Sequence, residues 1–379
     1  MKVVGIIAEF NPFHEGHAYL IRQAKEQCHA DHIIVCMSNY YVQRGEPAII
    51  PPNERVRAAL SHDVDLVLAL PACVSLSSAQ GFARGAVATL LATGVVDEIV
   101  FGTEGRIDRE ELVSLSEYLN NEPDDYQLAL KQYLKQGFSY PKARQHALMD
   151  CYQMPLSPFY ETANNILALE YVRALKHFKS DVSFSYVPRI KDISAHSIRR
   201  TLIENQNEGI EKDDFSALFH FRFVTDSSFL ETKAVAAASL NEDLARTISR
   251  VLTPQDTLTT LADKCHGKQL TYSHVMRALF CYLLALPPLK NSGQVAAYAP
   301  YLRILGFQKS DPAVLRALES NASVPVLKKL SKDISQLSED ARLFLEQDLK
   351  AADFYRLIAN RKYPDWDLKN EASTGMLFV

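Results

Sequence analysis

Two histidines close to the N-terminus carry the clearest chemical signal in the sequence. Residues 5–21 read GIIAEFNPFHEGHAYLI, with His14 and His17 on either side of a Glu-Gly pair. The apolar run Val3–Phe10 predicts a buried strand, and helical spacing begins at His17. A helix N-terminus offers unpaired backbone N–H groups and positive dipole character to phosphate oxygens. Because the two histidines could also donate hydrogen bonds to those oxygens, we predict a nucleotide-phosphate site with His14 and His17 as its catalytic residues.

The same residues permit two other interpretations. His14 and His17 are three positions apart, whereas the H-E-x-x-H motif of zinc proteases places them four apart, so we predict no metal ligands. The two rings could also simply cap the helix. The nucleotide site is favoured because the motif stands at the first strand-to-helix turn, and ligands of parallel sheets bind at the carboxyl ends of strands.

A second segment has the residue types of an anion site. After a late predicted strand the chain reads SAHSIRRTL over residues 194–202, which places Ser194, Ser197 and Arg199 at a helix start. Serines can cap a helix N-terminus and an arginine can balance phosphate charge. Arg189 and a lysine just upstream favour a local cationic cluster. The alternative is that the arginines lie on a solvated helix face.

The elements that must position these residues alternate between strands and helices. Such alternation predicts an α/β fold with a parallel sheet and right-handed crossovers. The predicted strands are Val3–Phe10, His32–Met37, Val64–Leu70, Glu98–Phe101 and Ser183–Val187. The predicted helices of this part are His17–Cys28, Asn53–Leu60, Ser78–Leu91, Arg109–Leu119, Tyr126–Gln136, Asn165–His177 and Ser197–Ile203.

The polar stretch Glu204–Asp214 is the best candidate for a linker. We therefore predict a catalytic, ATP-binding domain over residues 1–205 and an all-α domain over residues 206–379. The helices predicted for the second domain are Thr232–Leu252, Leu258–Ala262, Tyr272–Leu286, Pro312–Glu319, Val324–Leu330 and Asp340–Arg356.

The composition excludes several classes of protein. With 47% hydrophobic and 23% charged residues the chain is neither a low-complexity nor a collagen-like sequence, and its six scattered cysteines do not form a disulfide or zinc pattern. The formal net charge is −4, which argues against a polycation that coats nucleic acid. We find no apolar stretch long enough to cross a membrane and expect a cytoplasmic protein.

Several motifs, in collinear order, resemble one known family. They are EFNPFHEGH, MSNYYVQRGEPA, ERVRAAL, VDLVLALP, GFARGAV, FGTE and NNILALEY, all within about the first 200 residues, followed more weakly by APYLRILGF and SVPVL. Together they resemble the tRNA(Met) cytidine acetate ligase family, which belongs to the HxGH (HIGH-type) nucleotidyltransferase-like superfamily with a Rossmann-like parallel sheet.

The resemblance implies an activity and its substrates. The family is expected to activate acetate with ATP, accompanied by Mg²⁺, as acetyl-adenylate with release of pyrophosphate. It then transfers the acetyl group to N4 of the wobble cytidine of elongator tRNA(Met), giving N4-acetylcytidine. Carried over by motif, the ATP-binding residues are Ile7, Ala8, Glu9, Phe10, Asn11, Pro12, Phe13, His14, Glu15, Gly16, His17, Ala18, Tyr19, Leu20, Gly102, Asn164, Asn165, Arg189, Ser194, Ser197 and Arg199. The residues expected near acetate or tRNA are Gln43, Arg44, Glu46, Arg55 and Arg84.

The second half is expected to bind the tRNA. Aromatic and basic residues are interleaved there, a mixture that serves base stacking and phosphate contact. These clusters are Leu218–Arg222, Tyr301–Arg303, Lys328–Lys329, Tyr355–Arg356, Arg361–Tyr363 and Trp366. The alternative is that the aromatic residues belong to the core and the basic residues are solvated.

One departure from the family pattern keeps other functions open. We expect a longer glycine-containing insertion between Arg189 and the serine segment, but here the two are joined almost directly, and His196 stands where a small residue is usual. The alternatives are an adenylyltransferase that makes a dinucleotide-type cofactor and a nucleotide- or tRNA-binding protein with weakened catalysis.

Overall fold

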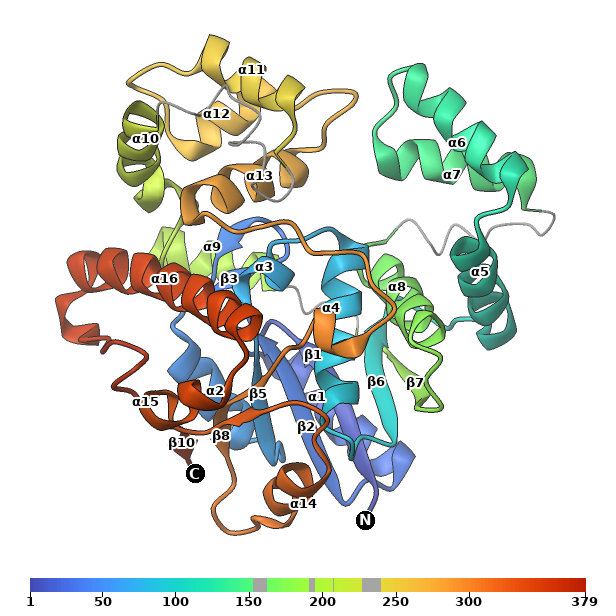
Figure 1. Ribbon diagram of the computed structural model, residues 1–379, viewed down its shortest axis with the longest axis vertical. Helices are drawn as coiled ribbons and strands as arrows, with labels where there is room; N and C mark the ends of the chain where they lie inside the picture. Colours follow the sequence, from blue (N-terminus) through green and yellow to red (C-terminus); the bar gives the residue numbers. More distant parts are fainter. Residues whose placement is uncertain (153–161, 191–194, 207, 227–239) are drawn as a thin grey trace.

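A computed structural model describes residues 1–152, 162–190, 195–206, 208–226 and 240–379. Its centre is a sheet with helices on both faces, and further helices lie beyond one end of the strands (Figure 1). Among the described residues, none of the helices has both the length and the apolar character that a membrane crossing requires.

The central sheet is mostly parallel. Its parallel strands are β1 (Val3–Ala8), β2 (His32–Ser38), β5 (Leu66–Leu70), β6 (Glu98–Thr103) and β7 (Ser183–Pro188). The order along the sheet is β10-β8-β5-β2-β1-β6-β7. The chain therefore builds outward from β1 through β2 and β5, then returns to the other side of β1 with β6 and β7. That reversal places a topological switch point between β1 and β6, where sheets of this kind bind ligands.

Two hydrophobic clusters cover the two faces of the sheet. Helices α1 (Glu15–Cys28) and α2 (Pro52–Leu60) pack on one face, through residues such as Ile21 and Val56. Helices α4 (Ala79–Ala92) and α8 (Ala163–His177) pack on the other, with Phe82 and Leu169 in the shared core. The strands carry apolar side chains on both faces because both faces are covered.

The remaining helices of the first half surround this core. They are α3 (Ala72–Ser75), α5 (Arg109–Asn121), α6 (Asp124–Lys135), α7 (Tyr140–Cys151) and α9 (Ala195–Gln206). The α6–α7 pair stands out from the body of the molecule, beside the group of helices beyond the strand ends (Figure 1). A two-stranded ribbon of β3 (Tyr41–Val42) and β4 (Glu46–Pro47) follows β2.

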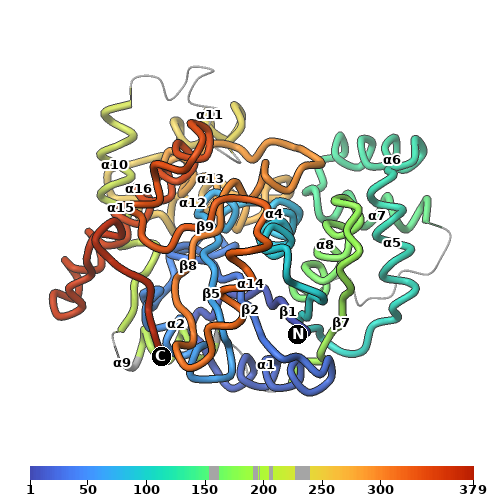
Figure 2. Tube along the Cα trace, turned by 60° about the horizontal axis from the view of Figure 1, so that its bottom comes forward, coloured from blue at the N-terminus to red at the C-terminus, as the bar shows by residue number. Residues whose placement is uncertain are grey.

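The second half is mainly helical, as predicted. Its helices are α10 (Ser216–Thr225), α11 (Glu242–Val251), α12 (Leu258–Cys265), α13 (Tyr272–Leu284), α14 (Ala313–Asn321), α15 (Leu330–Asp333) and α16 (Glu339–Lys362). Figure 2 shows α10–α13 and α16 gathered on one side of the sheet. The parallel-sheet α/β class and the helical second half are thus confirmed.

The second half also contributes strands that the sequence pattern did not predict. Strand β8 (Leu302–Phe307) pairs antiparallel with β5, and β9 (Val326–Leu327) and β10 (Leu377–Phe378) pair with β8. The chain after residue 206 therefore extends the sheet of the first half, which corrects the expectation of a purely helical, separate unit. A short buried apolar run such as LRILGF cannot be distinguished from a helix by periodicity. The helix predicted over Val324–Leu330 is wrong, since β9 occupies its centre.

Candidate active site

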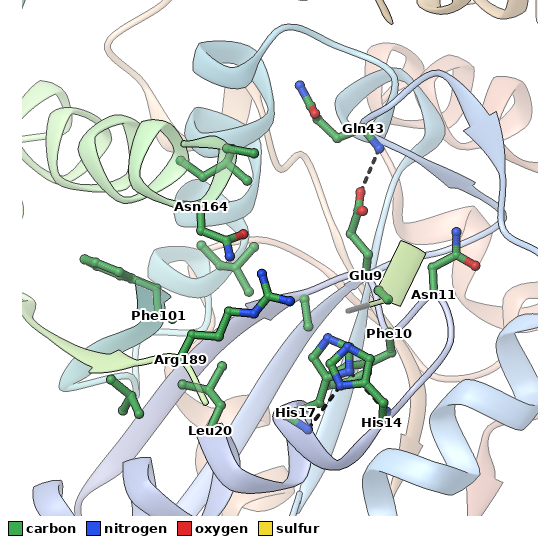
Figure 3. Close-up of a pocket in the computed structure, with 18 of the residues that line it drawn as sticks. Glu9, Phe10, Asn11, His14, His17, Leu20, Gln43, Phe101, Asn164 and Arg189 are labelled. Atoms are coloured by element: carbon green, nitrogen blue, oxygen red, sulfur yellow. Dashed lines mark hydrogen bonds between the residues drawn. The ribbon is translucent and has the colours of Figure 1, made fainter. Parts of the chain in front are cut away.

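A cavity of about 300 Å³ opens at the carboxyl ends of β1 and β6, at the switch point of the sheet. Residues from α1, α8, β7 and α9 complete its wall (Figure 3). Of the residues predicted from the sequence, the cavity is lined by Ile7, Ala8, Glu9, Phe10, Asn11, His14, Gly16, His17, Tyr19, Leu20, Gln43, Arg44, Gly102, Asn164, Arg189 and Arg199.

The two histidines begin helix α1 and bond to its backbone. His14 is the N-cap residue, and its Nδ1 accepts the N–H of Gly16 at 3.1 Å. The Nδ1 of His17 accepts the N–H of His14 at 3.3 Å, which closes a reciprocal capping box. Because both Nδ1 atoms are acceptors, the neutral rings carry their proton on Nε2. Each ring can therefore donate from Nε2 without being charged.

The histidine rings are held firmly in place. They stack on each other with centroids 3.7 Å apart, and Phe10 packs edge-on against His17 at 4.9 Å. Burial lowers the pKa of His14, with Arg189 acting in the same direction. Burial also lowers the pKa of His17 well below its usual value, and His14 and Arg189 add to this effect. Both rings are consequently neutral hydrogen-bond donors at neutral pH.

The wall opposite α1 is built from β6, β7 and α8. At Gly102 in β6 an added Cβ would meet nothing closer than the Val187 carbonyl oxygen at 4.0 Å, so a ligand can come close to the backbone here. Asn164 lines the cavity, whereas the neighbouring Asn165 is fully buried and its Oδ1 accepts the Glu104 N–H at 2.8 Å. Arg189 extends into the cavity from β7 (Figure 3).

A third wall is formed by the 40–50 loop, which comprises residues 40–50 and includes β3 and β4. The backbone N–H of Gln43 donates to the Glu9 carboxylate at 2.7 Å (Figure 3). Arg44 lies beside Arg199 of α9, and burial together with Arg44 lowers the pKa of Arg199. Arg199 also donates to the Asn11 carbonyl oxygen at 2.8 Å. This wall thus holds one carboxylate and two arginines close together.

Comparison with known proteins agrees with this site. A family model described as HIGH Nucleotidyl Transferase matches residues 1–202 and 194–370. A tRNA(Met) cytidine acetate ligase of Clostridium acetobutylicum is 33% identical over 395 residues, covering 94% of this chain and 96% of the relative. That of Fervidobacterium nodosum is 31% identical, with 96% of both chains covered. The chain belongs to the tRNA(Met) cytidine acetate ligase family.

Solved structures agree with this membership. The crystal structure of Thermotoga maritima TmcAL bound with α-thio ATP superimposes with a TM-score of 0.88 at 27% identity, with all of both chains covered. An apo form of the same protein gives the same TM-score and identity. The described fold is therefore shared with a solved TmcAL structure over the full length of both chains.

Some predicted residues lie outside the cavity. Pro12, Phe13, Glu15, Ala18, Asn165 and Ser197 are not among the lining residues, and Ser194 is outside the described residues. The Asn11–Pro12 peptide is cis, and Phe13 packs against Phe10 at 5.0 Å, so these residues shape the turn. The joint between Arg189 and Ser194, like the side chain of His196, is also not described.

Two arginines expected near the substrate are structural instead. Arg55 is 1% exposed and donates only to backbone carbonyls, including those of Glu9 and Ser38, both at 2.8 Å. It ties the end of β1 to the end of β2, and burial lowers its pKa to about 10. Arg84 donates to the Asn291 side chain at 2.6 Å and is not among the residues that line the cavity. Glu46 lies 3.6 Å from Lys212, on the 40–50 loop but outside the cavity lining.

The structure also corrects several proposed RNA contacts in the second half. Tyr301, Arg303 and Tyr355 are each at most 5% exposed, so they cannot stack on a base. Trp366 stacks on Tyr363 with centroids 4.6 Å apart and is partly exposed. In α10, Phe219 is buried whereas Phe221 is 69% exposed. The aromatic-basic pattern in this half is thus partly core and partly surface.

The sequence predicted only part of the apolar lining of the cavity, namely Ile7, Ala8, Phe10 and Leu20. Its lining also includes Phe82, Phe101, Ala163, Leu167, Tyr171, Val187, Pro188 and Ala195. Nothing in their spacing marks them as site residues, although Phe101 and Pro188 directly adjoin predicted ones. They give the ligand an apolar surface next to the charged one. Among the described residues, no group of three or more His, Cys, Asp or Glu side chains could hold a metal ion.

Proposed function

We propose that the protein is an ATP-dependent acetate ligase that forms acetyl-adenylate and acetylates N4 of the wobble cytidine of elongator tRNA(Met). Near-full-length similarity to relatives carrying that name supports the substrates. The observation that carries the ATP chemistry is that the α1 N-terminus, the neutral histidine pair, Arg189 and Arg199 open onto one cavity. Cytoplasmic tRNA is the acceptor in this proposal.

The cavity divides naturally into two parts. The adenosine would lie against β6 and α8, where Gly102 permits close approach, Asn164 supplies an amide and Leu167 an apolar contact. The triphosphate would lie at the α1 N-terminus, where the positive end of the helix dipole and the two Nε2–H donors are available to it. Because the histidines donate while neutral, their lowered pKa values do not prevent this role.

The first reaction needs charge neutralisation more than a base. An acetate oxygen attacks the α-phosphorus and forms the acyl–phosphate bond, while the bond to the bridging oxygen breaks and pyrophosphate leaves with that electron pair. Acetate is already ionised, so no proton is removed in this step. The step is accelerated by in-line positioning of the reactants and by stabilisation of the developing charge. Arg189, Arg199 and the histidine pair are placed for that purpose.

Mg²⁺ fits this site as a companion of ATP. The described residues gather no metal-binding cluster, so we propose that phosphate oxygens and water supply most of its ligands. The ion would offset part of the triphosphate charge, so that less of that charge would be left for the arginines to neutralise.

The tRNA would approach over the helices beyond the strand ends. The 40–50 loop faces this side and joins the cavity to the second half of the chain. The exposed basic residues of the second half, together with Phe221 and Trp366, are the remaining candidates for RNA contact. We keep residues 1–205 as the catalytic region and propose the helices after residue 206 as the tRNA-binding region.

One assay tests the proposal. The protein is incubated with ATP, labelled acetate and labelled pyrophosphate, with and without elongator tRNA(Met). Acetate-dependent ATP–pyrophosphate exchange without tRNA, and label on the tRNA when it is present, are expected. Turnover with a phosphate monoester but not with acetate would instead identify an adenylyltransferase. Binding of ATP or tRNA without turnover would identify a protein that has lost catalysis.

A further inference from the structure

Transfer of the acetyl group to cytidine poses a problem that adenylate formation does not. The exocyclic N4 of cytidine is a weakly basic amino group, and it must lose a proton when it becomes an amide. We propose that the Glu9 carboxylate is the general base that accepts this proton. The assignment deepens the proposed function and rests on it.

Glu9 is positioned to receive a proton from a substrate. It follows β1, lines the cavity, and points away from the histidine pair toward the 40–50 loop (Figure 3). One carboxylate oxygen, Oε1, accepts the Gln43 N–H at 2.7 Å. Within the described part of the chain, no hydrogen bond or ion pair engages Oε2. The carboxylate is therefore oriented by one oxygen and open for reaction through the other.

The other groups in the cavity are poorly suited to the task. Glu9 is the single carboxylate among the described lining residues. The Nδ1 atoms of His14 and His17 already accept backbone N–H groups, and their Nε2 atoms carry protons. The nearby Glu104 lies outside the lining and is paired with Arg189 at 3.5 Å and Asn164 at 3.3 Å. Elimination thus leaves the same residue that the geometry favours.

The surroundings of Glu9 shift its pKa upward. Burial raises the pKa of Glu9, opposed by the Gln43 N–H and by Arg44, Arg199 and Arg55. From α8 the Tyr171 phenol also faces it, and burial together with Glu9 raises the pKa of that phenol. A carboxylate whose pKa is raised is a stronger base than an exposed one.

The proposed transfer is a substitution at the acetyl carbon of acetyl-adenylate. The N4 lone pair attacks the acetyl carbon and forms the amide C–N bond, while the C–O bond to the adenylate phosphate breaks. AMP leaves with that electron pair, one N4 proton moves to Glu9, and Glu9 later releases it to water. No oxidant, reductant or further co-reactant is needed.

The test is Glu9→Gln, because a glutamine amide oxygen can still accept the Gln43 N–H. Two rates are measured: acetate-dependent ATP–pyrophosphate exchange, and single-turnover transfer from enzyme loaded with acetyl-adenylate to tRNA. We expect transfer to slow by at least about a hundredfold, and to lose far more of its rate than exchange does. In the wild type, transfer should accelerate as pH rises through the pKa of Glu9 and then level off. In Glu9→Gln this rise should be absent.

Two controls separate chemistry from folding. Glu26→Gln removes an exposed carboxylate on α1 and should leave both rates unchanged. An ATP-induced increase in Tm should persist in Glu9→Gln, which shows that the site is intact. Transfer at the wild-type rate in Glu9→Gln would overturn the assignment, as would equal losses of exchange and transfer, which would indicate a Mg²⁺ or ATP ligand. Absence of acetate-dependent exchange in the wild type would instead overturn the proposed function itself.

Discussion

The two sides of the cavity are constructed in different ways. The phosphate side is built from consecutive residues, in which the end of β1, the turn and the first residues of α1 supply the cap, both histidines and the helix N-terminus. The side that carries Gln43 and Arg44 is the 40–50 loop. Its contacts come from distant parts of the chain. A local motif is therefore sufficient to build the proposed phosphate side, whereas the side formed by the 40–50 loop depends on the whole fold.

The second half of the chain holds the 40–50 loop in position. Arg277 of α13 donates to the Gln43 carbonyl oxygen at 3.2 Å, and Tyr41 donates to the Ala351 carbonyl oxygen of α16 at 2.9 Å. Tyr355 of α16 donates to the Ala48 carbonyl oxygen at 2.8 Å. At Gly45, with φ +82°, an added Cβ would lie 2.6 Å from the Arg277 nitrogen, so only glycine permits this contact. A change in the position of α13 or α16 would thus act on the 40–50 loop directly.

The largest effect on activity is expected from a substitution on the phosphate side of the cavity. His17→Ala removes a donor at the phosphate site and should reduce acetate-dependent ATP–pyrophosphate exchange by at least about a hundredfold. Binding of tRNA, measured by filter retention, should be unchanged. The control is His62→Ala, whose ring bonds to the Ala58 carbonyl oxygen outside the cavity. Equal exchange in His17→Ala and the wild type would remove the phosphate role of His17.

A smaller effect on activity is expected from a substitution that acts on the 40–50 loop. Arg277→Met keeps the bulk of a buried side chain but leaves the Gln43 carbonyl oxygen without this donor. A displacement of the loop worth about 1.4 kcal/mol should slow acetyl transfer about tenfold while exchange changes little. Arg57→Met, which replaces an exposed arginine of α2 in the first half, is the matched control. If exchange and transfer fell together, the loop would serve both steps and the contrast between the two sides would fail.

The adjacent asparagines distinguish a ligand contact from a structural one. Asn165→Ala leaves the buried Glu104 N–H unpaired and should lower the free energy of unfolding by about 1–3 kcal/mol, measured in urea. Asn164→Ala should leave stability unchanged and weaken ATP binding about three- to tenfold, measured by calorimetry. The reverse pattern would assign the cavity contact to Asn165.

The smallest effect is a pH dependence of stability. The pKa of His17 is lower in the folded protein than its usual value of 6.5, so the unfolded chain binds more protons as pH falls below that value. The stability that neutral His17 provides is present above pH 6.5 and is lost as pH falls toward the folded pKa. Tm should therefore fall less on acidification in His17→Gln, which can keep the capping bond, than in the wild type. An identical pH dependence of Tm in both proteins would contradict the shift.

The match between sequence and structure follows the same division. The strands of the first half and the HxGH turn could be predicted because the pattern of a buried strand or a helix cap lies in consecutive residues. Strand β8 could not, since its partner β5 lies more than 200 residues earlier and its short apolar run has no distinctive period. The structural role of Arg55, which was expected to lie near acetate or tRNA, could not be predicted for a similar reason. Its four carbonyl acceptors belong to Glu9, to the neighbours Ser38 and Asn39, and to Ile50, which are brought together only by folding.

The sequence by itself determined the turn at which the phosphate site is proposed, because a strand end, a turn and a helix start need only neighbouring residues to take shape. The collinear motifs, likewise, were sufficient to indicate the ligase family. Only the tertiary structure decided which of Asn164 and Asn165 reaches the cavity, which arginines face it, and that Glu9 is the carboxylate left open there. Those outcomes depend on burial and on contacts between segments far apart in the chain, which no local pattern of residues records.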